Sequence, residues 1–501
     1  MPGAETWHLL VLATAASLTA ASILFFLAAR KQFAHSRAPR DSVDTQTSPT
    51  ALQSQQRRSR SRPHQRQRRR RRSPSPSPGP SSSSSSYSSW SSSSDSDSSD
   101  RRISRRRHPQ KSKMSQEQPV VYLNNPTACL DYVVGAGDRD EFEDVKNVAM
   151  KICDGWAAAD PNQITVKIVC GGITNRLYRL IFGDKSVLVR LYGDNTEAFI
   201  DRTVENRLFA LLSKNGFAPT YYGRFTNGRI EGWMDARPVE PEEMGQSSPV
   251  DFLSYVGKEL AKMHIMEMPE SRTPVLWTKL DQFERLAAEI TLDDPVKKAA
   301  LAKLDLPAWR QKLQWLKSVL PSEKNKHGDT LLAELSSSDE ITKQAFAYAN
   351  EVAFCHNDAL SGNILYNDSW DRVQIIDYEY GGYNYRAFDF ANHFVEHCGF
   401  EMNLSLYPNP DQQFAFFKAY MSLASPELLR SLEANKESKA FFHALYDAVN
   451  RFSLASHLFW GFWAIVQSAH SKIDFDFLEY AQLRFSAFEL QKSYFFAGAD
   501  N

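Results

Sequence analysis

The chain has 501 residues, with 59 Lys and Arg against 59 Asp and Glu, so its formal net charge is zero. That balance excludes a uniformly basic nucleic-acid-binding protein and a uniformly acidic tail protein. It also conceals a division, because residues 1–113 contain 21 basic and 6 acidic residues, whereas the remainder contains 38 and 53. A basic, low-complexity front therefore precedes an acidic body with enough apolar residues for a large core.

The first feature along the chain is an uncharged apolar run over residues 7–29. As a helix it would be roughly 34 Å long, enough to cross a hydrocarbon core of about 30 Å. No basic residue precedes the run, and Arg30 and Lys31 follow it, which argues against a cleaved signal peptide and would leave the body in the cytosol. Residues 1–30 are predicted as an apolar segment that either anchors the chain in a membrane or never inserts.

Residues 31–115 are rich in Arg and Ser, and 15 of the 20 residues from Ser81 to Asp100 are serine. Such a segment has too little apolar surface to fold, so we expect a disordered linker. Three interpretations stay open: RNA binding or nuclear association through Arg/Ser dipeptides, phosphorylation-tuned attachment to anionic membrane, and a solvated linker. We favour the linker, because no aromatic RNA-binding motif accompanies the basic runs, and nucleic acid is not the expected partner.

The body contains all five cysteines, and none of them belongs to a CxxC pair or to another short spacing typical of zinc sites. The scattered cysteines occur at Cys129, Cys153, Cys170, Cys355 and Cys398. An odd, scattered set indicates reduced thiols, and we expect a cytoplasmic location.

Alternating apolar residues predict an antiparallel meander at the start of the body, over residues 164–168, 177–182 and 186–191. Residues 196–212 have helical periodicity behind an Asn195 or Thr196 cap. A second hairpin is predicted over 220–225 and 230–234, around Asn227-Gly228. These elements form a predicted N-lobe over residues 116–235.

Residues 236–501 are predominantly helical in pattern, with an apolar stripe at Phe252, Val256, Leu260 and Met263. A short strand pair over 363–366 and 373–377 interrupts the helices. A small antiparallel sheet followed by a larger helical C-lobe predicts an α+β, two-lobed fold, with the site of a nucleotide-dependent transferase in the cleft.

The chemistry concentrates in the segment HNDALSGNIL and in the apolar strand that follows it. Asp358 and Asn363 lie five residues apart, and Asp377 ends the downstream strand. Phosphoryl transfer needs one carboxylate to accept the proton of the attacking hydroxyl and oxygen ligands for magnesium. This set, together with His356, is far more specific than an isolated Asp-x4-Asn pair, and it predicts catalysis rather than an ordinary turn.

Three strings in the body are long and particular: HNDALSGNIL, IIDYEYGGYNYRAFDFANHFVE and HLFWGFWAIVQ. Through them residues 163–490 resemble the choline/ethanolamine kinase family, whose fold is similar to that of protein kinases and aminoglycoside phosphotransferases. The HRD, DFG and APE strings and the GxGxxG loop of protein kinases are absent from the sequence, so a protein substrate is not expected.

The resemblance implies that Asp358 is the catalytic base and that Asn363 and Asp377 bind Mg2+, with Glu379 a further acid near the metal. It also implies a nucleotide site for ATP, in which a phosphate-covering hairpin and a cation meet the phosphates and the inter-lobe hinge meets adenine. The implied nucleotide-binding residues are Gly171, Gly172, Thr174, Asn175, Arg190, Glu231 and Met234. Glu205 could hold Arg190 as an ion pair.

For the amine, the resemblance implies a pocket formed by Glu396, Trp460, Trp463 and Tyr480, with Glu396 as the ammonium partner. On periodicity alone, a tryptophan stripe is more often core. A primary ammonium has three N–H donors and gains more from carboxylates than a quaternary group does. His397 and CGFEMNLSLYP follow the HFVE string, and this favours ethanolamine.

His356, Arg386 and Asp389 are expected to support the catalytic loop. The expected function is ATP-dependent phosphorylation of ethanolamine to phosphoethanolamine, the first step of phosphatidylethanolamine synthesis by the CDP-ethanolamine route. The alternatives are a choline or dual-specificity kinase and, in another class, a non-catalytic scaffold that acts through the Arg/Ser-rich front. The sequence leaves membrane contact of the N-terminus and a homodimer open.

Overall fold

The computed structural model describes residues 129–169, 175–193, 200–322, 338–471 and 473–496. The predicted apolar segment over 1–30 and the predicted linker over 31–115 lie outside the described residues. In the described ranges, no helix is both long and apolar enough to span a membrane. The cysteines placed there, Cys129, Cys153, Cys355 and Cys398, are free thiols.

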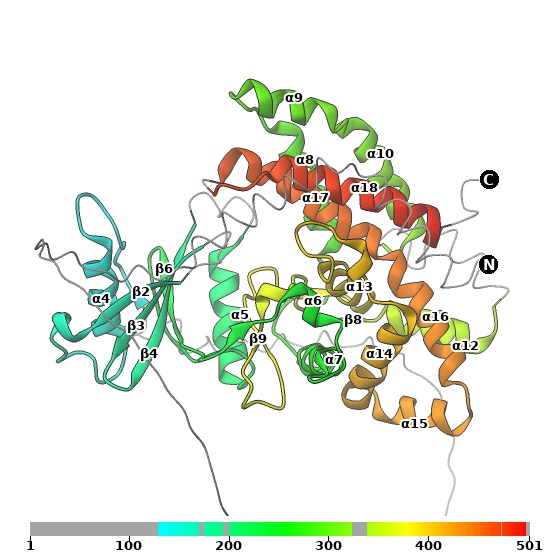
Figure 1. The fold of residues 1–501 in the computed structure, drawn as a ribbon, viewed down its shortest axis with the longest axis horizontal. Helices are drawn as coiled ribbons and strands as arrows, with labels where there is room; N and C mark the ends of the chain where they lie inside the picture. The colour runs from blue at the N-terminus through cyan, green and yellow to red at the C-terminus, as the bar shows by residue number, and fades with distance from the viewer. Residues whose placement is uncertain (1–128, 170–174, 194–199, 323–337, 472, 497–501) are drawn as a thin grey trace, which may run out of the picture. The chain divides into compact units, whose positions relative to one another are not determined.

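A six-stranded sheet in the order β1-β5-β6-β4-β3-β2 forms the centre of the N-lobe (Figure 1). Its strands are β1 (Cys129–Leu130), β2 (Thr165–Val169), β3 (Asn175–Phe182), β4 (Lys185–Tyr192), β5 (Tyr221–Phe225) and β6 (Gly228–Gly232). The meander β2-β3-β4 and the hairpin β5-β6 lie where alternation predicted them. The sheet is antiparallel as expected, except at one edge, where the two-residue strand β1 pairs with β5 in parallel.

Helix α4 (Glu141–Ile152) covers one face of this sheet, and the sequence analysis did not predict it. Asp140 caps it by accepting a hydrogen bond from the backbone N–H of Glu143 at 2.9 Å. Its apolar side packs into one cluster with β3 and β4, formed in part by Val145, Val148, Ile152, Leu180 and Val189. The helix therefore buries the sheet face that would otherwise remain open to water.

Helix α5 spans Arg202–Lys214, so the predicted start at 196 was wrong. The side chain of Asp201 caps the helix, because it accepts hydrogen bonds from the backbone N–H groups of Thr203 and Val204. The predicted caps at 195 and 196 lie outside the described residues. The apolar side of α5 joins the two lobes, because Leu208, Phe209 and Leu212 share a cluster with Met263, Phe354 and Tyr378.

The chain leaves the N-lobe through residues 233–236, which have no regular structure, and enters β7 (Arg237–Pro238). Strand β7 pairs with β9 (Ile364–Tyr366), and β9 pairs with β10 (Gln374–Ile375). Separately, β8 (Val352–Cys355) pairs with β11 (Gly382–Tyr385). These two small sheets bracket the segment that carries the predicted catalytic residues.

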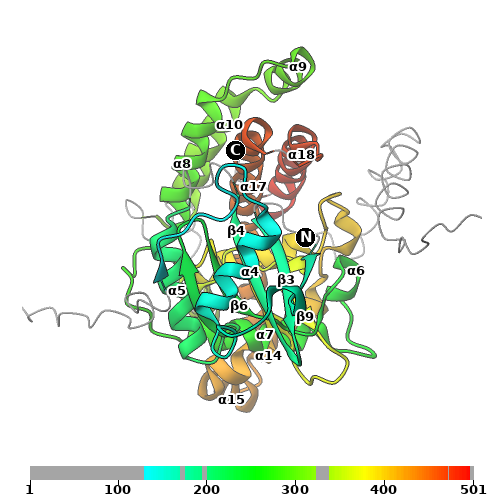
Figure 2. The same ribbon diagram turned by 90° about the vertical axis from the view of Figure 1, so that its left-hand side faces the viewer.

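Helices form most of the described C-lobe (Figures 1 and 2). They are α6 (Pro241–Met244), α7 (Phe252–His264), α8 (Leu276–Glu289), α9 (Pro295–Lys303), α10 (Leu306–Val319), α12 (Glu340–Ala349), α13 (Arg386–Glu396), α14 (Pro410–Ala424), α15 (Pro426–Ala434), α16 (Ser438–Arg451), α17 (Ser453–His470) and α18 (Phe477–Phe495). The predicted stripe on α7 is fully buried. Helices α17 and α18 lie side by side and share the main apolar cluster with α13.

Candidate active site

The catalytic loop connects β8 to a short 3-10 helix over Ser361–Asn363 and then to β9. Within it Asp358 is buried, and its pKa is raised well above the ordinary value, first by burial and then by the charges of Glu396 and other nearby carboxylates. The amide of Asn363 donates to the Asp358 carbonyl at 2.9 Å and to its carboxylate at 3.1 Å. The carboxylate that was predicted as the base is therefore more basic than that of an exposed aspartate.

Asp389, on α13, holds the start of this loop by hydrogen bonds to its backbone. Its carboxylate accepts from the backbone N–H groups of His356 at 2.9 Å and Asn357 at 2.6 Å, and from Nε2 of His264 at 2.9 Å. Burial acts to raise the pKa of Asp389, but the hydrogen bond and charge of His264 and the contacts with His356 outweigh it and lower the pKa. A buried, ionised carboxylate thus fixes the backbone immediately before Asp358.

The imidazole of His356 links the two halves of the site. Its Nε2 donates to the carbonyl of Ile376 at 3.0 Å, and its Nδ1 accepts the backbone N–H of Asp358 at 3.2 Å. Burial lowers the pKa of His356, so the ring is neutral and both nitrogens are used. His356 therefore couples the backbone of Asp358 to the backbone that precedes Asp377.

Asp377 lies just beyond β10, with a backbone φ of +67°. Its Oδ2 accepts from Nη1 of Arg190 at 3.1 Å, whereas its Oδ1 is buried without a hydrogen-bond partner in the part of the chain that the structure describes. An unsatisfied buried carboxylate oxygen is costly unless a cation or another donor binds it. The carboxylate oxygen of Asp377 and the side-chain amide oxygen of Asn363 are ligands of the type that a divalent cation with a preference for oxygen would bind.

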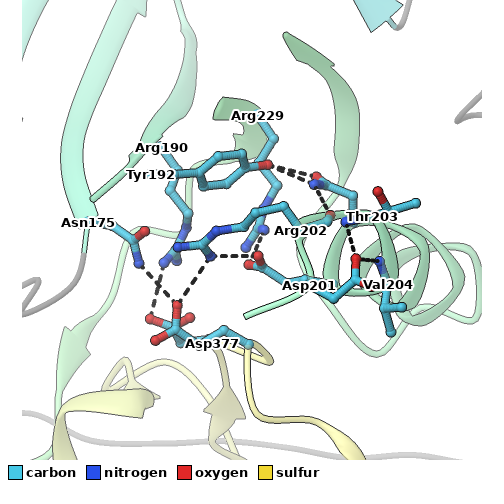
Figure 3. Close-up of polar contacts among 12 residues, drawn as sticks. Asn175, Arg190, Tyr192, Asp201, Arg202, Thr203, Val204, Arg229 and Asp377 are labelled. Atoms are coloured by element: carbon cyan, nitrogen blue, oxygen red, sulfur yellow. Dashed lines mark hydrogen bonds and ion pairs between the residues drawn. The ribbon is translucent and has the colours of Figure 1, made fainter. Parts of the chain in front are cut away.

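A buried network of arginines and carboxylates connects the N-lobe sheet to Asp377 (Figure 3). Arg190, on β4, pairs with Glu231 at 2.9 Å, and Arg229 pairs with the same carboxylate oxygen at 2.7 Å. The expected ion pair between Arg190 and Glu205 was wrong, because Glu205 pairs with Arg229 at 2.5 Å and Arg202 at 2.6 Å. Register explains this: Arg190 and Arg229 are cross-strand partners in β4 and β6.

Glu379 lies at the C-lobe end of the network. Its Oε2 is 3.5 Å from Nη1 of Arg202 and accepts a long 3.4 Å hydrogen bond from Asn175. Burial, followed by the charge of Asp377, raises the pKa of Glu379 to about 7. The structure therefore brings Asn175, Arg190, Asp377 and Glu379 together where phosphates were predicted to bind.

The remaining predicted nucleotide residues divide into two groups. Gly171, Gly172 and Thr174 lie outside the described residues. Glu231 lies in β6, directly before the connection without regular structure over 233–236 that includes Met234, and its side chain holds Arg190. The expected contact of the backbone from Glu231 to Met234 with adenine stays a prediction.

The predicted amine residues gather on the other side of Asp358, on α13, α17 and α18. Glu396, at the end of α13, is the carboxylate whose charge raises the pKa of Asp358 most, and it contacts Nη1 of Arg484 at 2.8 Å. The indole N–H of Trp463 donates to the Tyr380 hydroxyl at 2.9 Å. The rings of Trp460 and Trp463 stand edge-to-face, 5.4 Å apart, and Tyr480 is buried next to Arg484.

Arg386 does not support the catalytic loop as expected. Its guanidinium donates to the Tyr348 carbonyl at 2.6 Å and pairs with Glu351 at 2.5 Å, so it fixes the turn between α12 and β8. His397 also differs from an amine-pocket residue, because its ring contacts His393, which in turn contacts the Ala359 carbonyl at 2.8 Å.

Three polar residues were missed by the sequence analysis. Asn357, with φ +64°, donates to the carbonyls of Tyr380 and Gly382. Asn392 donates to the Asn357 carbonyl, and Arg484 holds Glu396. Asn357 and Asn392 lie inside the strings that carry the family resemblance, whereas no local pattern marks Arg484 as a partner of a residue 88 positions away.

Comparison with known proteins gives one consistent result. The choline/ethanolamine kinase family model matches residues 166–489. A probable ethanolamine kinase from Arabidopsis thaliana is 34% identical over 67% of this chain and 82% of its own length. Ethanolamine kinase 1 from Mus musculus is 34% identical over 66% of this chain and 84% of its own length.

Two solved structures share the fold. The chain superposes on an ethanolamine kinase from Plasmodium vivax with a TM-score of 0.55 and 24% identity, over 71% of this chain and 90% of that one. For a choline kinase from Cryptosporidium parvum the TM-score is 0.56 with 23% identity, over 71% and 96%. These likenesses confirm the two-lobed, protein-kinase-like fold class.

Proposed function

The chain belongs to the choline/ethanolamine kinase family, and from that premise we propose that it transfers the γ-phosphoryl group of ATP to ethanolamine. The product, phosphoethanolamine, enters phosphatidylethanolamine synthesis by the CDP-ethanolamine route. One observation carries the proposal: three groups with the required roles lie in one site. They are the carboxylate of Asp358, which can accept a proton, the buried Oδ1 of Asp377, which has no hydrogen-bond partner among the described residues, and the guanidinium of Arg190.

Asp358 acts as the general base. The ethanolamine hydroxyl attacks the γ-phosphorus, the new O–P bond forms as the bond to the ADP oxygen breaks, and the hydroxyl proton passes to the Asp358 carboxylate. A raised pKa makes that carboxylate a better proton acceptor than an exposed aspartate. The Asn363 amide orients it through the 3.1 Å hydrogen bond.

Asp377 and Asn363 would hold Mg2+, which supplies positive charge to the phosphates during transfer. The buried Oδ1 of Asp377, which has no hydrogen-bond partner among the described residues, supports this assignment. Glu379 lies beside the same site and contacts Arg202. We assign Glu379 to the surroundings of the cation rather than to proton transfer.

Arg190 and Asn175 bind the nucleotide phosphates from the N-lobe, and the connection over 233–236 receives the adenine. Arg190 is held ready by Glu231, which contacts its Nε and leaves the Nη groups directed to the C-lobe side. Gly171, Gly172 and Thr174 complete the phosphate-covering hairpin in this proposal. Asn175 and Arg190 lie on the Asp377 and Glu379 side of the site.

Glu396 binds the ammonium group, and Trp460, Trp463 and Tyr480 form the pocket walls. A carboxylate accepts a hydrogen bond from a primary ammonium, and aromatic faces attract its charge. The charge of Glu396 raises the pKa of Asp358, and in this proposal the amine of a two-carbon amino alcohol pairs with Glu396 while its hydroxyl meets Asp358. This arrangement is the basis for choosing ethanolamine within the family.

Two further assignments stay proposals. We propose a cytoplasmic body with membrane contact through residues 7–29, and assembly of the chain as a homodimer. Cell fractionation of the full chain checks the first, and light scattering checks the second. A chain found only in the soluble fraction would contradict the membrane contact.

The function is tested by measuring phosphoethanolamine formed from ATP, Mg2+ and ethanolamine by the full chain and by Asp358→Asn. The wild-type protein is expected to turn over, and the variant is expected to lose at least a hundredfold in kcat, the scale of a general base. Asp368→Asn, which alters an exposed aspartate on the nearby loop, is the matched control. Full turnover by Asp358→Asn would contradict the mechanism.

A further inference from the structure

Arg484, on α18, is a completely buried arginine with an unusual concentration of contacts. Its Nη1 lies 2.8 Å from Oε1 of Glu396 and 3.1 Å from the Tyr480 hydroxyl. Its Nη2 donates to the carbonyl and the hydroxyl of Ser456, at 3.1 and 2.7 Å. One guanidinium therefore connects α13, α17 and α18.

The contacts of Arg484 continue to the tryptophan side of the amine pocket. The Ser456 hydroxyl, which accepts from Arg484, donates to Oδ1 of Asn392 at 2.8 Å. The same Oδ1 accepts the indole N–H of Trp460 at 2.8 Å. Arg484 thus contacts Glu396 directly and reaches Trp460 through two hydrogen-bonded side chains.

A buried arginine can simply join helices, so its partners decide what else it does. Among the four residues assigned to the amine, Arg484 contacts Glu396 and Tyr480 and orients Trp460 through Asn392. A planar guanidinium holds several acceptors in fixed directions, which a flexible lysine cannot do. The Arg484 contacts are therefore concentrated on the pocket.

The geometry at Glu396 favours a primary amine over a quaternary one. Arg484 contacts Oε1 of the carboxylate, so the ammonium group of the substrate would bind Oε2. A primary ammonium donates an N–H to that oxygen, whereas a quaternary ammonium has no N–H to donate. Fixing the direction of the carboxylate therefore benefits ethanolamine more than choline.

We propose that Arg484 is a positioning residue that holds Glu396, Tyr480 and Trp460 in the geometry that binds a primary ammonium and favours it over a quaternary one. The inference rests on the proposed function, because the reaction supplies the amine. Arg484 does not touch the substrate; it acts through the residues that do.

The test compares full-chain wild type with Arg484→Gln, Arg484→Lys and the control Arg430→Gln, which alters an exposed arginine on α15. KM for ethanolamine, choline and ATP is measured for each. Arg484→Gln is expected to raise the ethanolamine KM by about tenfold or more and the choline KM by about threefold or less, and to leave the ATP KM within about twofold. Arg484→Lys is expected to recover part of the loss.

A smaller change, Ser456→Ala, keeps the test decisive if the Arg484 variants do not fold. It removes the hydroxyl between Arg484 and Asn392 and is expected to raise the ethanolamine KM by about threefold with the ATP KM unchanged. Equal changes in all three KM values, or an unchanged ethanolamine KM in every folded variant, would overturn the inference. Absence of ethanolamine turnover in wild type would instead reject the proposed function.

Discussion

Replacing Asp389 by Asn tests whether a buried carboxylate holds the catalytic loop. Oδ2 of Asp389 accepts from His264 and His356, and Oδ1 accepts from Asn357. An amide has one acceptor oxygen, so Asp389→Asn places an NH2 group against at least one of these donors. The best rotamer keeps the two bonds on one oxygen and leaves the N–H of Asn357 unsatisfied.

The expected loss in the free energy of unfolding is about 3 to 5 kcal/mol. An unsatisfied buried donor costs about 1–3 kcal/mol, and each remaining bond loses about 1 kcal/mol when its acceptor is no longer charged. Relief of the buried charge acts in the opposite direction. The pKa of Asp389 is lowered despite burial, which shows that its favourable contacts outweigh that cost.

Urea unfolding and steady-state kinetics measure the two consequences. Besides the lower stability, kcat is expected to fall at least tenfold, because Asn357 precedes Asp358 directly. The control is Asp251→Asn at the α7 N-cap, where Asn can accept the same Ser254 N–H bond, so little change is expected. A loss below about 1 kcal/mol in Asp389→Asn, with normal kcat, would refute the reasoning.

Three further changes have defined outcomes. Arg190→Lys cannot bridge Glu231 and the phosphate side, so the ATP KM should rise about tenfold; an unchanged ATP KM would exclude the phosphate role. Gly461→Ala should lower the free energy of unfolding by about 1–3 kcal/mol, because its Cβ would lie 2.4 Å from the Phe485 ring; an unaltered urea midpoint would show that α17 and α18 separate freely. Burial lowers the pKa of His393 to about 4, so the unfolded chain binds a proton first and stability falls as the pH drops from about 6.5 to 4. His393→Asn should remove roughly 3 kcal/mol of that fall, and identical pH dependence in wild type and variant would contradict the assignment.

The strands and the catalytic segment could be predicted because their signals are local. Alternation over 164–191 predicted β2, β3 and β4, and the turn at Asn227-Gly228 predicted β5-β6. The same pattern overestimated burial at the sheet edge, since Ile168 on β2 is 64% exposed. Helix α4 also has a local signal, in its Asp140 cap and its apolar spacing.

Ion-pair partners could not be predicted because they depend on register and on long-range packing. Arg190 and Arg229 face one another only because β6 pairs with β4 after the chain has passed through α5 and β5. Glu231 then lies on the same face and accepts from both. The contact between Glu396 and Arg484 likewise requires α13 and α18 to meet, which no local spacing indicates.

The catalytic roles of Asp358, Asn363 and Asp377 remain predictions from the motif, the resemblance and the geometry. The structure adds the contacts that hold the catalytic loop. His356, Asn357 and Asp389 saturate the buried polar groups around it, and such networks specify a single arrangement when every member is satisfied.

The most direct test is the ratio of kcat/KM for ethanolamine to kcat/KM for choline, measured on the purified full chain with saturating ATP and Mg2+. We predict that ethanolamine is preferred at least tenfold, about 1.4 kcal/mol in transition-state free energy. A tenfold preference for choline would contradict the assignment of the amine, and absence of ATP-dependent turnover with either amine would contradict the account as a whole.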